Sequence, residues 1–281
     1  MKHLIDAYKN SPSLSIKYDT YFPVYDEILS KYRDKEITLI EVGVFNGGSL
    51  FMWRDYFGSK ARIIGVDLNP AAKMWEQHGF EIFIGDQASE AFWQQLFGAV
   101  GPVDVLIDDG GHTNLQQIVT VHCAIEHIRD GGVLIVEDVH TSYFREFGNP
   151  WGRSFVGFAS KIVDAVNSRA AALKTSRERY ASRVHQVGFF ESIIAFHVNT
   201  KLCKKSSPTS NGGITQNASD FRYQGAIQSW LFSAKNTLSS STGSISRLFS
   251  RMAVRGIDML LLALSRLEGV RHARYWRADI K

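Results

Sequence analysis

The sequence predicts an α/β fold built on a doubly wound, largely parallel sheet. Between residues 35 and 138, short runs of β-branched and aliphatic residues alternate with longer segments of helical period. Each short run is nearly all apolar, as expected for parallel strands that helices cover on both faces. Five β-α units of this kind form a doubly wound sheet with right-handed crossovers.

The individual elements follow in order along the chain. Five apolar runs are the expected parallel strands: Ile37–Val42, Arg62–Asp67, Glu81–Ile84, Val103–Asp108 and Val133–Glu137. Five segments of helical period are the expected helices: Ser49–Phe57, Ala71–Gly79, Ser89–Phe97, Thr113–Arg129 and Phe155–Ser176. The two β-rich halves of residues 184–198 are expected to form an antiparallel pair that completes a seven-stranded sheet.

Composition excludes several other classes of protein. Of 281 residues, 44% are hydrophobic and 21% are charged, which excludes a disordered, collagen-like or disulfide-stapled chain. The longest apolar run near the C-terminus, Met259–Leu264, is far shorter than the stretch of about 20 residues that spans a bilayer. The first residues lack the apolar core of a signal peptide, and Cys123 and Cys203 have no metal-ligand or redox spacing. We therefore expect a cytoplasmic protein.

The charge is distributed unevenly along the chain. Residues 1–150 carry 12 Lys/Arg against 21 Asp/Glu, a net of −9, whereas residues 151–281 carry 20 against 7, a net of +13. Every expected parallel strand ends at or near an acid, and ligands of such sheets bind beyond the carboxyl ends of the strands. The acidic half is therefore where cation-dependent chemistry is expected.

A glycine-rich turn follows the first strand. It reads Glu41-Val-Gly43-Val-Phe45-Asn-Gly47-Gly48-Ser49. Its outer glycines, Gly43 and Gly48, have the spacing of the dinucleotide-binding fingerprint, but Phe45 stands where the middle glycine would approach a pyrophosphate. A dinucleotide is therefore disfavoured. With Glu41 beside it, the turn suits a cofactor that has a cationic or zwitterionic end.

Two later strand ends extend this cofactor site. Asp67 stands where an acid accepts both ribose hydroxyls, and Asp86 can accept a hydrogen bond from an adenine amine. An adenosine with an amino-acid tail and no phosphates is S-adenosylmethionine (SAM). The expected cofactor residues are Glu41, Gly43, Gly47, Gly48, Ser49, Asp67, Asp86 and Asp108. Taken singly, each can also belong to a plain tight turn or a helix cap.

The fourth and fifth strands end in a second group of polar residues. The fourth delivers Asp108, Asp109 and His112, and the fifth delivers Glu137 and Asp138. If these strands are adjacent, their carboxylates converge and require a counter-cation. Hard oxygen ligands suit Mg²⁺, so we assign Asp109, Glu137 and Asp138 as its ligands. His112 is then free to act as a general base, the alternative being a cap for the helix that follows it.

These motifs resemble a known enzyme family. E-x-G-x-x-x-G-G-S, D-D-G-G-H and E-D-V-H-T-S-Y are similar to motifs of the metal-dependent class I SAM-dependent methyltransferases, typified by the macrolide and aminocoumarin sugar O-methyltransferases. The mycinamicin and macrocin enzymes belong to that family, and the protein of cephalosporin 7-α-methoxylation is a relative. The resemblance covers about residues 15–200 and implies a Rossmann-like methyltransferase sheet in a domain spanning residues 35–203.

The resemblance also implies roles for individual residues. The family's Mg²⁺ ligands fall on Asp109, Glu137 and Asp138, and its general base falls on His112. By the same resemblance, the metal would hold two neighbouring sugar hydroxyls while the base deprotonates one of them. The aromatic segment around Tyr21 resembles the family's cofactor-closing segment, which gives residues 1–34 that role. The fourth-strand motif departs from the common D-G-S-H, because a glycine replaces the serine.

The acceptor is expected to meet aromatic side chains after the fifth strand. Tyr143 and Trp151 can stack on a sugar ring, whereas core packing is an equal alternative for Phe144 and Phe147. The expected function is SAM- and Mg²⁺-dependent methylation of a sugar hydroxyl, on a glycoside natural product or a surface glycan. A catechol-like vicinal diol is an alternative acceptor, and a non-catalytic SAM-binding scaffold is an alternative function. No motif indicates a nucleic-acid partner.

Residues 204–281 are expected to be a polar linker followed by a basic amphipathic helical appendage. Apolar residues recur at near-helical spacing beyond Ile245, beside a ridge of arginines, and Gly256 is expected to break the helix. The helix is expected to pack on its own domain or on a partner subunit of a homo-oligomer. The alternative is a peripheral contact with an anionic membrane surface.

Overall fold

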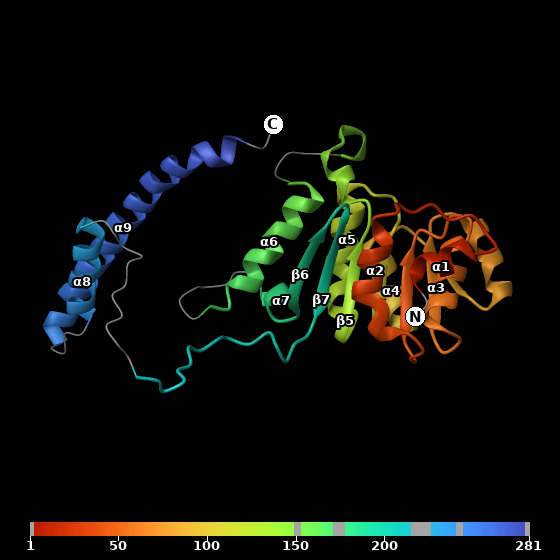
Figure 1. Ribbon diagram of the computed structural model, residues 1–281, viewed down its shortest axis with the longest axis horizontal. Helices are drawn as coiled ribbons and strands as arrows, with labels where there is room; N and C mark the ends of the chain where they lie inside the picture. Colours follow the sequence, from red (N-terminus) through yellow and green to blue (C-terminus); the bar gives the residue numbers. More distant parts are fainter. Residues whose placement is uncertain (1–2, 149–152, 171–177, 215–225, 240–243, 279–281) are drawn as a thin grey trace. The chain divides into compact units, whose positions relative to one another are not determined.

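The computed structural model describes residues 3–148, 153–170, 178–214, 226–239 and 244–278 (Figure 1). The chain divides into two compact units, Met1–Pro208 and Thr209–Lys281. The first unit contains the whole sheet and the second contains two helices.

A seven-stranded sheet forms the centre of the first unit, with strand order β3-β2-β1-β4-β5-β7-β6. The strands are β1 (Thr38–Val42), β2 (Arg62–Asp67), β3 (Glu81–Ile84), β4 (Val103–Asp108), β5 (Ile128–Val136), β6 (Val184–Phe190) and β7 (Ile193–Val198). The first five are parallel, and β7 pairs antiparallel with both β5 and β6. The predicted parallel sheet with a C-terminal antiparallel pair is therefore confirmed, and β4 and β5 are neighbours.

Helices cover both faces of this sheet (Figure 1). They are α1 (Leu4–Lys9), α2 (Tyr21–Leu29), α3 (Gly48–Phe57), α4 (Glu90–Val100), α5 (Asn114–Ala124), α6 (Phe155–Asn167) and α7 (Glu178–Ala181). One hydrophobic core joins α1, α2 and α3 to Leu39 and Ile63, and the other joins α4, α5 and α6 to Ile40 and Ile64. Successive strand residues thus enter opposite cores, which explains their continuous apolar runs.

Several elements differ from those that the sequence predicts, and among them the helix expected at Phe155–Ser176 ends at Asn167 as α6. The expected helix at residues 71–79 is a 3₁₀ helix, η2 (Pro70–His78), whose first turn is capped by Asn69 Oδ1 accepting from Ala71 N at 3.0 Å. The expected helix at 113–129 ends at Ala124, followed by the short 3₁₀ helix η3 (Ile125–His127). It ends early because β5 begins at Ile128, before the expected Val133, and pairs with Val103 across an irregularity in β4.

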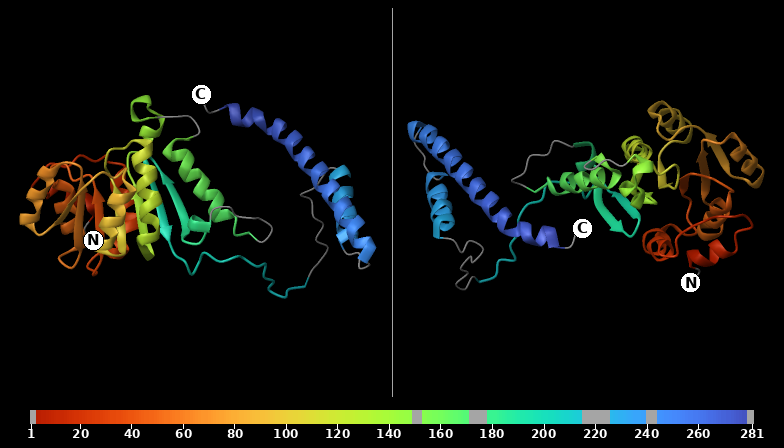
Figure 2. Two further views of the ribbon diagram at one scale, coloured as in Figure 1. Left: turned by 180° about the vertical axis from the view of Figure 1, so that it is seen from behind. Right: turned by 90° about the horizontal axis from the view of Figure 1, so that it is seen from above.

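The second unit contains α8 (Ala226–Ser239) and α9 (Ser244–Ala278), which lie side by side (Figure 2). The expected break at Gly256 is wrong, because α9 continues through it. A glycine inside a helix costs about 1 kcal/mol but keeps its N–H donor, so it does not interrupt the hydrogen bonds as proline would. Among the described residues, no helix is long and apolar enough to cross a membrane.

Glu41 ties the end of β1 to the first turns of α3. Its side chain is fully buried, and its two oxygens accept hydrogen bonds from Ser49 Oγ at 2.7 Å and Trp53 Nε1 at 2.8 Å. Burial raises the pKa of this carboxyl to about 7, against the opposing effects of Lys17 and these two donors. The turn between β1 and α3 is therefore held by a buried acid.

Gly43 brings the end of β1 against the backbone that follows β4. Its φ is +89°, and a Cβ added to it would lie 2.0 Å from the carbonyl oxygen of Asp109. The amide of Asp109 donates to Val42 O at 2.9 Å, which holds the two segments together. Only glycine permits this approach, since any side chain would meet backbone rather than a movable group.

We expect Gly43→Ala to destabilise the first unit by more than about 3 kcal/mol, because it adds a backbone clash to an unfavourable φ. Gly79→Ala is the matched control. Gly79 has a φ of +81° but nothing within 4 Å of an added Cβ, so only the conformational cost of about 1 kcal/mol should remain. Urea denaturation followed by circular dichroism measures both. Equal losses would contradict the close approach.

We expect Glu41→Gln to change the pH dependence of stability. The folded-state pKa of about 7 lies above the ordinary 4.5, so this carboxyl stabilises the fold most below pH 4.5 and loses that contribution as the pH rises through 7. Between pH 5 and pH 8, the wild type should lose about 2–3 kcal/mol relative to Glu41→Gln. Urea titrations at several pH values measure this difference, and parallel profiles would contradict it.

Candidate active site

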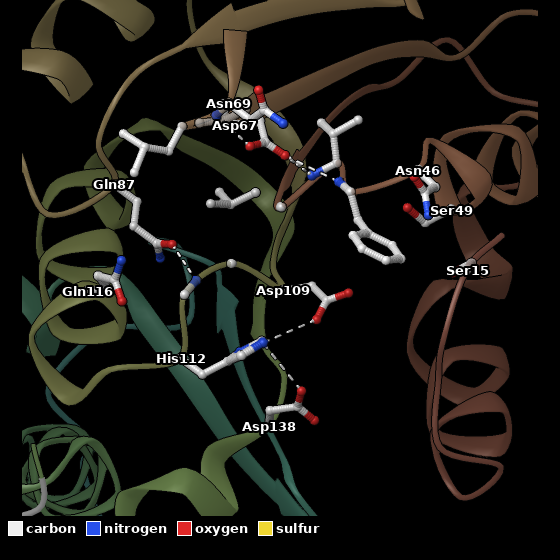
Figure 3. A pocket seen from close by; sticks show the side chains of 18 of the residues that line it. Ser15, Asn46, Ser49, Asp67, Asn69, Gln87, Asp109, His112, Gln116 and Asp138 are labelled. Carbon is white, nitrogen blue, oxygen red and sulfur yellow. Dashed lines mark hydrogen bonds and ion pairs between the residues drawn. The ribbon is translucent and has the colours of Figure 1, made fainter. Parts of the chain in front are cut away.

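A pocket of about 660 Å³ opens at the carboxyl ends of the parallel strands (Figure 3). It is walled by the turns that follow β1, β2, β3 and β4, together with residues 14–16 of the N-terminal segment. Seven of the residues that the sequence predicts for the site line it: Gly43, Ser49, Asp67, Asp86, Asp109, His112 and Asp138. The pocket thus lies where a doubly wound sheet binds its ligand.

Asp67 links the turn after β1 to the end of β2. Its Oδ2 accepts from the amides of Val44 at 2.9 Å and Phe45 at 3.2 Å, and its Oδ1 accepts from Asn69 N at 2.8 Å. Asp86 likewise accepts from Ala88 N at 2.8 Å. Each carboxylate oxygen has lone pairs for a further donor, so both acids can still accept from a ligand in the pocket.

Four of the predicted cofactor residues lie behind the residues that line the pocket. A Cβ on Gly47 would lie 2.5 Å from the Trp75 ring, and a Cβ on Gly48 would lie 2.4 Å from the carbonyl oxygen of Ser13. Asp108 is buried, and its Oδ1 accepts from Gly110 N at 3.2 Å. Glu41 is buried behind Ser49 in the same way.

Gln87 is a pocket residue that the sequence analysis did not single out. Its Nε2 donates to Asp108 Oδ1 at 2.9 Å, and its Oε1 accepts from Gly111 N at 2.8 Å. The side chain therefore fixes the loop that carries His112. The sequence could have indicated Gln87, because it directly follows Asp86 at the end of an apolar strand.

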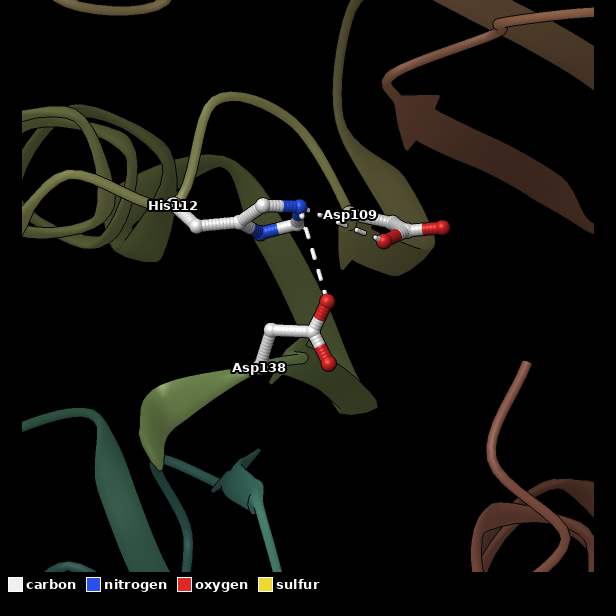
Figure 4. A group of neighbouring side chains, drawn as sticks. All are labelled: Asp109, His112 and Asp138. Atoms are coloured by element: carbon white, nitrogen blue, oxygen red, sulfur yellow. Dashed lines mark ion pairs between the residues drawn. The ribbon is translucent and has the colours of Figure 1, made fainter. Parts of the chain in front are cut away.

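Asp109, His112 and Asp138 meet at one end of the pocket (Figure 4). His112 Nε2 lies 3.9 Å from Asp109 Oδ1 and 3.5 Å from Asp138 Oδ2. One potential ligand atom from each residue lies within 4.8 Å of the others. His112 and Asp138 also have φ values of +56° and +54°, a strained backbone of the kind that clusters at functional sites.

Glu137, the third predicted metal ligand, has other partners. Its side chain is 1% exposed, and its Oε1 accepts from Lys17 Nζ at 2.6 Å and from the hydroxyl of Tyr25. Lys17 Nζ also lies 2.6 Å from Asp109 Oδ2. The hydroxyl of Tyr21 donates to Asp138. Tyr21 therefore contacts the acid cluster, although it does not line the pocket.

These contacts determine the ionisation of the buried groups. Burial lowers the pKa of the Lys17 ammonium, but Asp109 and Glu137 raise it by more, so the net shift is upward and the lysine stays charged. Burial, followed by the nearby Asp109, raises the pKa of the Glu137 carboxyl, and Lys17 opposes that rise. Burial and Glu137 raise the pKa of the Tyr25 hydroxyl well above its ordinary value, so it remains a donor.

The donor set at the end of the pocket fits a hard divalent cation. In the described part of the chain, Asp109 Oδ1 and Asp138 Oδ2 accept no hydrogen bond and face the His112 ring. Two carboxylates with a free oxygen each, about 21–22% exposed, leave room for the waters or substrate oxygens that Mg²⁺ retains.

The structure describes only one of the two predicted acceptor residues. Tyr143 belongs to the 3₁₀ helix η4 (Val139–Tyr143), is 66% exposed, and does not line the pocket. Trp151 lies outside the described residues.

Residues 40–139 match the family model of a methyltransferase domain. The chain is 29% identical over 212 residues to the 8-demethyl-8-α-L-rhamnosyl tetracenomycin-C 2′-O-methyltransferase of Streptomyces olivaceus, covering 70% of this chain and 53% of the relative. It is 31% identical over 181 residues to the demethylmacrocin O-methyltransferase of Streptomyces fradiae, covering 60% of this chain and 45% of the relative. The chain thus spans about half the length of the curated relatives it matches.

A solved structure has the same fold. It is the MycE methyltransferase of the mycinamycin biosynthetic pathway in complex with Mg, SAH and mycinamycin VI, with a TM-score of 0.62 and 24% identity, covering 70% of this chain and 52% of that one. The resemblance read from the three motifs is confirmed: residues 40–139 match the model of a methyltransferase domain, and the chain is similar to sugar O-methyltransferases over about half of their length.

Proposed function

We propose that this chain is a SAM- and Mg²⁺-dependent O-methyltransferase that methylates a sugar hydroxyl. One observation carries the proposal: Asp109, His112 and Asp138 line the same pocket as the predicted cofactor residues Gly43, Asp67 and Asp86. Figure 3 labels Asp67 and the three residues of the acid end. Methyl transfer is an in-line displacement, so the acceptor oxygen must lie directly beside the methyl donor. A pocket with cofactor residues at one end and a base with acids at the other meets this requirement.

The cofactor end offers a distinct group for each part of SAM. Asp67 and Asp86 supply acceptors for the ribose and adenine, while the turn from Gly43 to Ser49 forms the wall for the amino-acid end. SAM supplies the methyl group when bound. The chain's part is to hold the donor in one orientation through walls fixed by Gly43 and Gln87.

The other end holds the acceptor and receives its proton. Asp109, Asp138 and Glu137 would hold Mg²⁺, which supplies Lewis acidity toward a bound hydroxyl. His112 Nε2 faces the two aspartates and takes the proton of the hydroxyl to be methylated. The loop position of His112 is fixed by Thr141, whose hydroxyl donates to His112 O at 2.8 Å.

A sugar acceptor is favoured by the relatives, which are named for 2′-O-methylation of a rhamnosyl tetracenomycin and for O-methylation of demethylmacrocin. The glycoside natural product and the surface glycan predicted from the sequence both supply the vicinal hydroxyls that the metal end requires. A catechol-like diol places the same demand on the metal and is the alternative acceptor. A SAM-binding scaffold remains the non-catalytic alternative, and methyl transfer to any diol would exclude it.

The second unit supports a proposal for a binding partner. Val254, Ile257, Leu261 and Leu264 are half-buried along one face of α9, at the spacing that packs against α8. Met252, Met259 and Leu267 form a second apolar stripe, two turns apart on the opposite face, and all are more than 60% exposed. Arg251, Arg255 and Arg266 follow one edge of this stripe. An anionic membrane surface fits such a face, and the second copy of a homo-oligomer is the alternative partner.

We expect His112→Ala to lower kcat by about 10²–10⁴-fold, because the variant has no base to take the proton of the acceptor hydroxyl. The affinities for SAM and Mg²⁺ should stay within a few fold of the wild type, because a base acts only on the reacting proton. Asp138→Asn should instead weaken Mg²⁺ binding. Radiolabelled methyl transfer to a panel of glycosides measures turnover, and calorimetry measures both affinities. Unchanged turnover in His112→Ala would remove its assigned role.

We expect the full chain to co-sediment with vesicles that contain anionic lipid and much less with neutral ones. Met259→Glu combined with Leu267→Glu should reduce that binding, since both changes place charge on the exposed stripe. Leu115→Glu is the control, because Leu115 is 64% exposed, as Leu267 is, but lies in the first unit. Equal sedimentation of all three proteins, or a stable dimer with no lipid binding, would contradict the membrane surface.

A further inference from the structure

Lys17 is the cation that the acid cluster requires, and it comes from the chain itself. Its ammonium lies 2.6 Å from both Asp109 Oδ2 and Glu137 Oε1, and its side chain is 1% exposed. The Glu41 carboxylate, when it is ionised, also favours the charged lysine. Charges this deeply buried are tolerated only when they are paired, so Lys17 is integral to this end of the pocket.

The segment that carries Lys17 also forms part of the pocket wall. Leu14, Ser15 and Ile16 line the pocket immediately before it. The segment is fastened at two points, since Ser11 Oγ donates to Gly48 O at 2.8 Å and the hydroxyl of Tyr8 donates to Ser15 O at 3.0 Å. A movement of the ammonium would therefore disturb the wall of the cofactor pocket.

Lys17 and a divalent cation require the same oxygens. The assigned ligands are Asp109, Glu137 and Asp138, whereas the residues whose potential ligand atoms lie within 4.8 Å of one another are Asp109, His112 and Asp138. Glu137 instead accepts from Lys17 and Tyr25. An ammonium and a dication that share two carboxylates repel each other strongly where the dielectric constant is low. The two cations therefore cannot share both carboxylates without a cost.

We propose that Lys17 is an internal counter-cation that competes with the divalent ion for Asp109 and Glu137, so that metal binding displaces its ammonium and loosens residues 14–17 from the pocket wall. This inference rests on the proposed function, because it assumes the divalent-ion site. It makes Lys17 a positioning residue that sets metal affinity and the order of the N-terminal segment, without touching the reacting atoms.

The test uses the full chain and Mg²⁺ alone, with two substitutions that differ in one property. Lys17→Gln keeps a hydrogen-bond donor but removes the charge, whereas Lys17→Met removes both. If charge competition is the effect, both variants should bind Mg²⁺ about tenfold more tightly than the wild type by calorimetry. The control is Lys9→Gln, which changes an exposed lysine at the end of α1, and the Mg²⁺ affinity of this variant should be unchanged.

A second measurement needs no variant. Hydrogen exchange at residues 11–20 of the wild type should become faster when Mg²⁺ is added, because the ammonium that anchors the segment has been displaced. In EDTA, Lys17→Met should also melt at a lower temperature than the wild type, since buried carboxylates lose their partner.

The outcomes separate this inference from the proposed function. Equal or weaker Mg²⁺ binding by both Lys17 variants, or unchanged exchange at residues 11–20, would overturn competition while leaving the metal site intact. Weaker binding by Lys17→Met with wild-type affinity in Lys17→Gln would instead assign Lys17 the role of a hydrogen-bonding support for the ligands. An absence of Mg²⁺ binding in every protein would overturn the metal site and this inference together.

Discussion

Much of this structure depends on the electrostatic repulsion between carboxylates that converge at the ends of two adjacent strands. Asp109 follows β4, while Glu137 and Asp138 follow β5, so the parallel pairing of these strands places three acids together. Unscreened acids would repel one another in this setting. The N-terminal segment supplies hydrogen-bond donors to these acids. Lys17, Tyr21 and Tyr25 each donate to at least one of the three carboxylates. The N-terminal segment is thereby tied to the carboxyl edge of the sheet.

The position of these acids at strand ends explains which parts of the site the sequence could predict. Strand ends are visible in the sequence because apolar runs stop at an acid, and parallel pairing then makes neighbours of Asp109 and Asp138. The turn after β1 was visible through its glycines. These features depend on local pattern and on the rules of parallel sheets. They are therefore sufficient to predict the fold and seven of the residues that line the pocket.

Other features depend on contacts between distant parts of the chain, which no local pattern encodes. Lys17 meets Glu137 across 120 positions, and Tyr25 meets it across 112. Nothing in the spacing of residues 17–25 distinguishes a lysine paired with buried acids from one in solvent. The continuous course of α9 through Gly256 was missed for a different reason, because the packing of two helices outweighs one unfavourable helix position.

The close approach of Gly43 to Asp109 has a consequence for how such a domain can change. The turn that walls the proposed donor site and the first proposed metal ligand share one backbone contact, with no side chain between them to be altered. The spacing between the wall of the proposed donor site and the backbone of Asp109 is thus set by the main chain. Changes at exposed positions of the loop after β5, such as Tyr143 and Phe144, can therefore alter the surface beside the pocket while this backbone spacing is kept.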